Sequence, residues 1–275
     1  NNIKLNFQAK NQFEEFVKII LFKLMPVSYL EGYKTILSEV EKINYSPKVV
    51  LTATGVFSNV FFQIWIANQV SKGTKLLLCD HGGYWEKDEY FSSFTKMGDF
   101  HLSWGKSESK KTIQVPMNLN LKKKKILQNI KEKKILMLLN SELLYNLRLR
   151  HQPICGQILE DYNLWKNFIN NLDNKIRNNL IIRPHPSHDS WNLVEKCNRD
   201  FGENYISKRS LLKDDTNRAK VIVDTHIQSP FFENMKTGIP MITLFNRTIL
   251  NMDTKTSELF DIFLENKIIV QNSIE

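Results

Sequence analysis

The sequence lacks the features that mark several large classes of protein. Its three cysteines are an odd number without a CxxC pair, which excludes a disulfide framework and a cysteine zinc site and indicates a reducing compartment. The longest apolar run, residues 56–70, is interrupted by Asn59, Gln63 and Asn68, so no transmembrane span is expected. The GxxxxGK[ST], GxGxxG, HExxH and GxSxG patterns are also missing. Any chemistry must therefore come from other motifs.

The composition is that of a folded protein with a surplus of positive charge. Hydrophobic residues make up 42% and aromatic residues 11% of the 275 residues, enough to bury sizeable cores. The formal net charge is +9, part of it in Lys122–Lys125 and Lys131–Lys134. Such a surplus attracts phosphates on a nucleotide, a nucleic acid or an anionic membrane, although a solvated helix face explains it equally well. The chain starts at Asn1 without a signal-peptide pattern, and residues 10–25 read as an amphipathic helix in mid-fold.

Short β-branched runs alternate with helical stretches, which is typical of an α/β fold with parallel sheets. A shift to Lys and Asn near residues 116–120 separates two lobes, residues 1–117 and 118–275. The first lobe shows about four strands, so we expect its beginning to be missing, whereas the second shows a complete doubly wound set. The expected strands are residues 48–51, 75–79, 99–104, 112–115, 134–139, 180–183, 221–223, 241–244 and 268–270. The expected helices include residues 57–70, entered through Ser58, then 157–172, 191–200, 230–237 and 257–265.

In sheets of this kind, ligands bind beyond the carboxyl ends of the strands, and polar clusters occur at several such positions. The first follows KLLLC: His81 could donate to a phosphate or act as an acid or base, and Gly82 and Gly83 let the backbone approach a ligand. Glu86, further along the same loop, could supply a carboxylate. The plainer interpretation is a strand-to-loop turn with surface charge. His101 is expected to be a core or edge histidine.

The second cluster, Arg183-Pro184-His185-Pro186, follows the run LII. Its prolines stiffen the chain in an extended turn. Arg183 and His185 would then stand at the mouth of the sheet, where both can contact phosphate oxygens. A rigid turn with an exposed histidine is the alternative.

The third cluster follows VIV and runs from Asp224 to Glu233. Thr225, Ser229 and the free amides ahead of Pro230 predict a helix N-terminus suited to a phosphate. Glu233 lies one turn further and could accept hydrogen bonds from a ribose diol. An ordinary helix capped by Ser229 is the alternative.

A fourth stretch follows the first strand of the second lobe. Asn140, Arg148 and Arg150 are expected to face the cleft between the lobes. Asp161 shares the start of a helix face with Gln157, and together with Glu86 it would provide two carboxylates for sugar transfer. Ordinary charges at a helix entry are the alternative.

Taken in order, the motifs CDHGG, DFHLSWG, LLNS, NLRLR, GQILEDY, IIRPHP, VIVDTHIQSPFFE and TGIPMITLFN resemble those of bacterial surface-carbohydrate transferases of the GT-B type. That resemblance covers residues 48–270. It implies two Rossmann-like lobes with a cleft between them. It also extends to bacterial Kdo- and sialyltransferases, in which a His-Pro motif and a Ser/Thr motif hold CMP. By this resemblance His185 and Pro186 contact the nucleotide, Thr225 and Ser229 its phosphate, and Glu233 the ribose.

The resemblance predicts a glycosyltransferase. Because no DxD motif with the context of a metal-bound diphosphate occurs, we expect it to need no metal and no cofactor. A retaining mechanism would use Asp161 or Glu160 as nucleophile and Glu86 as acid/base, and an inverting one would use His81 or Glu86 as base. The Ser-Ser pair of many CMP-sugar enzymes is replaced here by Thr225-His226, and His226, like Arg183, is expected among the nucleotide-binding residues.

The expected partners are a nucleotide sugar, of which CMP-Kdo or a similar CMP-ulosonic acid is one candidate, and a glycan or lipid-linked glycan of lipopolysaccharide O-antigen or capsule. The expected location is the cytoplasm, with peripheral contact at the anionic inner leaflet of the inner membrane. One alternative is a transferase of glycerol or ribitol phosphate from a CDP-alcohol. A nucleic-acid-binding protein is the more distant alternative. No nucleic acid is expected as partner, because the distinctive residues lie at strand ends and not on an exposed strand face.

Overall fold

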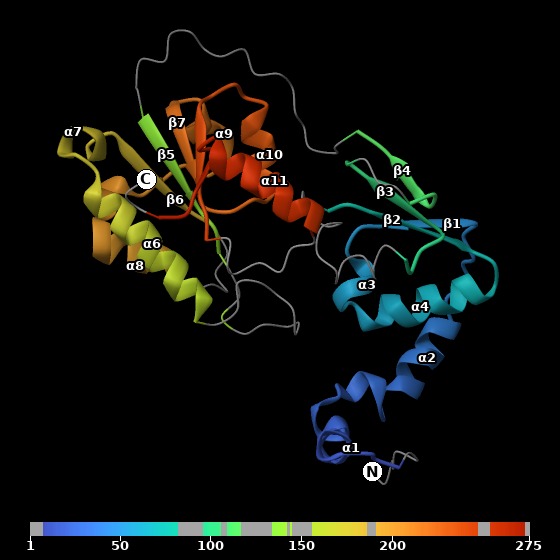
Figure 1. Cartoon of the computed structure of the whole chain (residues 1–275). Coiled ribbons are helices and arrows are strands. Elements are labelled where there is room, and N and C mark those ends of the chain that lie inside the picture. The colour runs from blue at the N-terminus through green and yellow to red at the C-terminus, as the bar shows by residue number, and fades with distance from the viewer. Residues whose placement is uncertain are drawn as a thin grey trace. The chain divides into compact units, whose positions relative to one another are not determined.

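The computed structural model describes residues 8–81, 96–105, 109–116, 134–141, 144, 156–185, 191–246 and 254–272. The chain forms two compact units, each with its own sheet (Figure 1). The first unit comprises residues 1–81 and 97–115, and the second comprises residues 82–96 and 116–275.

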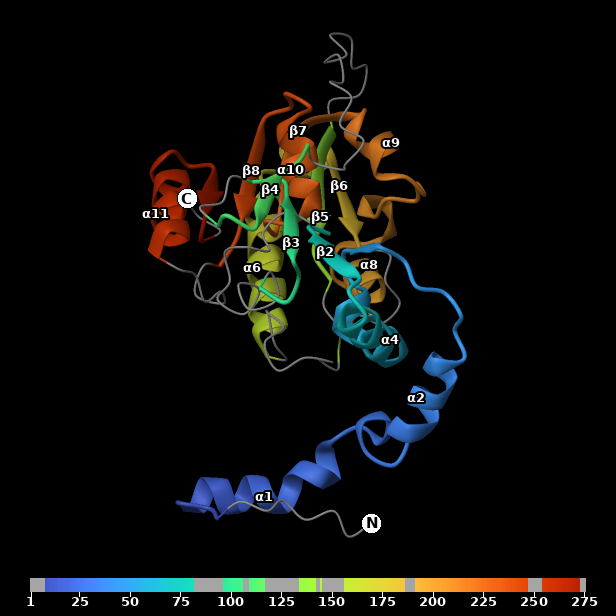
Figure 2. The ribbon, with the colours of Figure 1, turned by 90° about the vertical axis from the view of Figure 1, so that its right-hand side faces the viewer.

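The first unit contains a parallel sheet in the order β1-β2-β3-β4 (Figure 1), of which β2, β3 and β4 are also labelled in Figure 2. A helix expected over residues 57–70 is two helices, because Asn59 takes an extended conformation with φ −95° and ψ 95°. Asn59, and not Ser58, then caps the second helix by accepting a hydrogen bond from the amide of Phe62.

The described elements of the first unit are α1 (Gln12–Leu24), η1 (Val27–Tyr29), α2 (Tyr33–Glu41), β1 (Val49–Thr52), α3 (Gly55–Ser58), α4 (Val60–Ser71), β2 (Lys75–Cys79), β3 (Phe100–Ser103) and β4 (Thr112–Gln114).

The second unit contains a parallel sheet in the order β6-β5-β7-β8-β9. The expected α/β fold with parallel sheets is thereby confirmed. Its described elements are β5 (Lys134–Leu139), α6 (Gln157–Asn171), α7 (Asn174–Arg177), β6 (Leu180–Pro184), α8 (Leu193–Phe201), η3 (Glu203–Tyr205), α9 (Leu212–Thr216), β7 (Ala219–Asp224), α10 (Ser229–Met235), β8 (Met241–Leu244), α11 (Thr254–Glu265) and β9 (Ile269–Val270).

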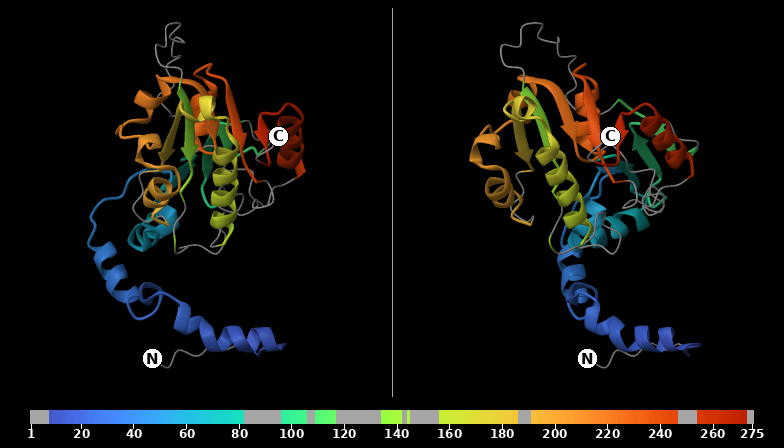
Figure 3. Two further views of the ribbon diagram at one scale, coloured as in Figure 1. Left: turned by 90° about the vertical axis from the view of Figure 1, so that its left-hand side faces the viewer. Right: turned by 60° about the vertical axis from the view of Figure 1, so that its left-hand side comes forward.

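Helices cover both faces of this second sheet (Figure 3). Because side chains alternate along a strand, β5 sends Met137 to one face and Leu136 and Leu138 to the other. The Met137 face packs against α6 and α8, with Trp165 at its centre. The opposite face packs against α9 to α11. Such two-sided burial explains why the strands are apolar runs and not alternating ones.

None of the helices in the described part of the chain has the length and apolar character that crossing a bilayer requires.

Candidate functional site

The carboxyl ends of β5, β6 and β7 form one edge of the second sheet, and several of the predicted site residues lie there. The register places Leu139 opposite Pro184 and Leu138 opposite Asp224. Asn140, His185 and Thr225 are therefore the first residues beyond three neighbouring strands. Since adjacent strands are about 4.8 Å apart, the backbones at His185 and Thr225 are separated by roughly 10 Å along this edge. His185 is exposed and Asn140 half-buried.

Thr225 ties this edge together. Its hydroxyl donates to the carbonyl of Leu138 at 2.8 Å and accepts from the amide of Asn140 at 3.0 Å. The side chain is buried, with 2% of its surface exposed. Thr225 thus holds the end of β7 against the end of β5. Its expected contact with a phosphate stays a prediction, and its hydroxyl hydrogen is already used.

Asp224 is a buried carboxyl group directly behind Thr225. Its Oδ1 accepts hydrogen bonds from the amides of Thr225 at 2.8 Å and His226 at 3.3 Å. Its Oδ2 is buried and has no hydrogen-bond partner among the described residues. Burial raises the pKa of Asp224 to about 7, and the two amide bonds only partly oppose this rise. The carboxyl group is therefore close to half protonated at neutral pH.

His226 lies beside Asp224 and is also buried, with 5% of its surface exposed. Its ring packs edge-on against Phe245, with 5.3 Å between the ring centres. The side chain expected at the nucleotide is therefore part of the packing between the end of β7 and β8. Its role at a nucleotide stays a prediction.

Arg183 serves the fold in a way that the sequence did not indicate. Its guanidinium pairs with the buried carboxylate of Asp215 at 2.7 Å and donates to the carbonyl oxygens of Arg209 and Ser210, each at 2.9 Å. Ser207 also donates to Asp215. Arg183 thereby fastens the segment 207–210 to β6. A contact between Arg183 and a phosphate stays a prediction.

Ser229 and Glu233 both lie on α10. Ser229 is the first residue of this helix, and Gln228 occupies the cap position without a side-chain hydrogen bond. The helix spans 7 residues, shorter than expected, so few peptide dipoles add up at its N-terminus. Both side chains are half-buried. The N-terminus of α10 is therefore a weaker candidate for the phosphate site than the strand ends are.

The carboxylates expected on α6 differ in their surroundings. Asp161 is buried, with 4% of its surface exposed, whereas Glu160 is exposed. Both lie in the first turns of α6, which returns from the carboxyl end of β5. Of the two, the side chain of Glu160 is the one that solvent reaches.

The first unit holds a second polar network at the end of β2. Asp80 accepts from Ser103 at 3.0 Å and from the amide of Trp104 at 2.8 Å, and lies 2.8 Å from Nε2 of His101. His101 is buried, as expected for a core histidine. His81, the next residue, is exposed. Asp80 thus fixes the strand end from which His81 projects.

Replacing Asp80 by alanine is expected to lower the free energy of unfolding by about 2 kcal/mol, because it leaves buried donors without an acceptor. Urea denaturation followed by tryptophan fluorescence measures this change. The variant Asp80→Asn keeps one oxygen acceptor and should lose less. A loss below about 0.5 kcal/mol for the alanine variant would show that the network adds little stability.

Some predicted site residues lie outside the described residues. They are Gly82, Gly83, Glu86, Arg148, Arg150 and Pro186. Conversely, sequence reasoning missed Asp215, the partner of Arg183. Nothing in the stretch Lys213-Asp214-Asp215-Thr216 distinguishes this carboxylate from a surface one, so only its contact with Arg183 identifies it.

Comparisons with known proteins bear on the chain as a whole. None of the curated proteins compared with the sequence matches it. Among solved structures, a protein from Listeria monocytogenes assigned as a UDP-N-acetylglucosamine 2-epimerase aligns with a TM-score of 0.47 and 12% identity, over 86% of this chain and 66% of its own. MnaA of S. aureus, in a co-structure with UDP, aligns with a TM-score of 0.45 and 13% identity, over 86% of this chain and 67% of its own. The chain thus spans about two thirds of the length of these structures.

A match at the level of sequence families covers the whole chain. The profile of the LIC12162 family transferases matches residues 1–275. The chain belongs to the LIC12162 family of transferases.

Proposed function

We propose that this transferase moves a glycosyl group from a nucleotide-activated donor, and that the donor phosphate binds at the carboxyl edge of β5, β6 and β7. The observation that carries the proposal is the convergence of Asn140, His185 and Thr225 on that edge. In doubly wound sheets this is the edge where nucleotides bind.

The edge is suited to stabilise a leaving phosphate. Negative charge builds up on the nucleotide as the glycosidic bond breaks, and fixed donors close to that charge lower the barrier. His185 is exposed at the edge and can donate from its imidazole. The hydroxyl of Thr225 accepts from the amide of Asn140 and donates to the carbonyl of Leu138, and these bonds hold the neighbouring backbone in place. In this proposal protein donors act in place of a metal, so chelation by EDTA should leave transfer unchanged.

A carboxylate completes the proposed chemistry. In a retaining transfer Glu160 or Asp161 would attack the anomeric carbon as the nucleotide leaves, and the carboxylate of Glu86 would then take the proton of the acceptor hydroxyl that displaces it. In an inverting transfer a single base, His81 or Glu86, would suffice. Exposure favours Glu160 over the buried Asp161. The motif resemblance favours a CMP-linked ulosonic acid as donor and a bacterial surface glycan as acceptor.

Replacing His185 by alanine is expected to reduce donor hydrolysis at least tenfold, because the leaving phosphate loses a donor, which corresponds to about 1.4 kcal/mol or more. The assay measures release of the nucleotide from a panel of CMP-, CDP-, UDP- and GDP-linked sugars. The panel also contains CDP-glycerol and CDP-ribitol, which separate sugar transfer from alcohol-phosphate transfer.

The matched control is Lys236→Ala, an exposed cation just beyond α10. Both variants should keep the thermal midpoint of the parent, because both side chains are exposed. Equal turnover of His185→Ala and the parent chain would rule out the proposed donor edge.

A further inference from the structure

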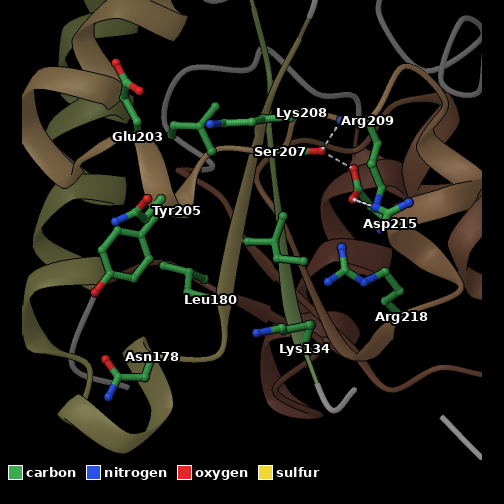
Figure 4. A pocket seen from close by; sticks show the side chains of 13 residues that line it. Lys134, Asn178, Leu180, Glu203, Tyr205, Ser207, Lys208, Arg209, Asp215 and Arg218 are labelled. Atoms are coloured by element: carbon green, nitrogen blue, oxygen red, sulfur yellow. Dashed lines mark hydrogen bonds and ion pairs between the residues drawn. The ribbon is translucent and has the colours of Figure 1, made fainter. Parts of the chain in front are cut away.

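The second unit contains a pocket along β6, the first strand of its sheet. Its volume is about 590 Å³, within the usual range for small-molecule sites (Figure 4). Lys134 and Leu180 begin β5 and β6, and Arg218 directly precedes β7. The pocket therefore extends from the amino-terminal ends of these strands along β6 to the segment 207–209, which contacts Ile182 and Arg183. None of Asn140, His185 and Thr225 lines it.

One wall of the pocket is the segment 203–209, which is firmly attached to the sheet. Ile206 pairs with Ile182 of β6, and the amide of Ser207 donates to the carbonyl of Ile182 at 2.8 Å. The buried pair of Arg183 with Asp215 fastens the end of the same segment. The pocket is thus preformed, so a ligand would not have to order it.

The charges in the pocket favour an anion. Four cationic side chains line it, with two carboxylates. One carboxylate, Asp215, is already compensated by Arg183 at 2.7 Å and by Arg209 at 3.7 Å. Among the described residues no ion pair involves Lys134 or Lys208. The pocket-lining cations are Lys134, Lys208, Arg209 and Arg218.

The opposite side of the pocket is suited to an uncharged, hydroxylated part of a ligand. Lys208 and Lys134 extend from opposite ends of the pocket toward the side that carries Glu203, Tyr205 and Asn178 (Figure 4). The half-buried ring of Tyr205 offers an apolar surface, and Arg177 lies 5.7 Å from its centre. The carboxylate of Glu203 can accept hydrogen bonds from hydroxyl groups, and the amide of Asn178 can both donate to them and accept from them.

We propose that this pocket binds a phosphate monoester on a hydroxylated carbon skeleton. The phosphate would lie between Lys134 and Lys208, and the hydroxyl groups would face Glu203, Tyr205 and Asn178. Two lysines bind a phosphate as point charges, and the half-buried position of Lys134 strengthens the attraction compared with an open surface. The ligand can be a soluble sugar phosphate or the phosphorylated headgroup of a lipid. This site is separate from the proposed donor edge.

Titration calorimetry with glucose 6-phosphate tests the proposal, with glucose as the uncharged probe. The parent chain should bind glucose 6-phosphate, and glucose should fail to bind. The double variant Lys134→Ala/Lys208→Ala should bind glucose 6-phosphate at least tenfold more weakly. The matched control Lys72→Ala/Lys236→Ala removes two exposed cations outside the pocket and should keep the affinity within twofold. Thermal midpoints show that both double variants are folded.

A second arm identifies the source of the phosphate. Phosphatidylcholine vesicles with and without phosphatidylinositol 4-phosphate are sedimented with each variant. One result is that the chain sediments only with the vesicles that contain phosphatidylinositol 4-phosphate, and loses this binding in Lys134→Ala/Lys208→Ala. That result identifies a lipid headgroup as the phosphate-bearing ligand and supports the proposed chemistry.

Two results would overturn the pocket assignment. One is that Lys134→Ala/Lys208→Ala binds glucose 6-phosphate and glucose with the same affinities as the control Lys72→Ala/Lys236→Ala. The other is that His185→Ala abolishes binding of glucose 6-phosphate, which would place this ligand at the donor edge. Retained glucose 6-phosphate binding in a His185→Ala chain that has lost donor hydrolysis supports the two sites independently.

Discussion

Replacing Arg183 by methionine is expected to lower the free energy of unfolding by about 3–5 kcal/mol, the usual cost of removing one partner from a buried ion pair. Asp215 has 1% of its side chain exposed and Arg183 13%, so solvent cannot replace the lost guanidinium. The change also leaves the carbonyl oxygens of Arg209 and Ser210 without their donor. Chemical denaturation monitored by circular dichroism measures the loss.

The pair Arg199 and Asp200 offers a matched control. Arg199 also contacts an aspartate, at 3.0 Å, but 70% of its side chain is exposed, so Arg199→Met should change stability little. The double variant Arg183→Met/Asp215→Asn should recover a large part of the loss, because it also removes the buried carboxylate, which in Arg183→Met is left with the more distant Arg209 at 3.7 Å as a cationic partner. If it recovers nothing, the cost comes from the lost carbonyl contacts and not from the buried charge.

Replacing Asp224 by asparagine is expected to stabilise the protein by up to about 4 kcal/mol at pH 8, since each unit of pKa shift corresponds to about 1.4 kcal/mol. The pKa of Asp224 is raised from 3.8 to about 7 by burial. Between these two pH values the folded chain keeps a proton that the unfolded chain has lost. The contribution of this group to stability is therefore highest below pH 4, falls as pH rises from 4 to 7, and stays low above that.

Unfolding curves measured from pH 4 to pH 8 test whether the contribution of Asp224 to stability falls as pH rises. The parent should lose stability over that interval relative to Asp224→Asn, whose side chain has no proton to release. Asparagine keeps an oxygen acceptor for the amides of Thr225 and His226. Asp224→Ala removes that acceptor and should be less stable than the asparagine variant. Parallel curves for parent and asparagine variant would show that Asp224 does not titrate in this range.

The strands of both sheets could be predicted because their sequences are unambiguous. Lys75–Cys79 and Lys134–Leu139 occur as strands with the predicted bounds, and the runs LII and VIV lie within β6 and β7. Apolar runs of this length, separated by helical stretches, can be buried only in a sheet covered on both faces. The bounds of helices were harder to predict, as the break at Asn59 shows. A side chain that caps a new helix competes with continuation of the preceding one.

The sequence alone determined that the chain alternates strands and helices, that two parallel sheets follow, and that polar clusters stand at the strand ends. Only the tertiary structure decided what those clusters contact. Arg183 meets Asp215, 32 residues away, and Thr225 meets Leu138, 87 residues away. A side chain binds whichever group the fold brings within about 3 Å, and that distance depends on how all the elements pack. For the same reason the pocket at Lys134 and Lys208 could not be predicted from the sequence, since its walls come from separate segments that meet only after folding.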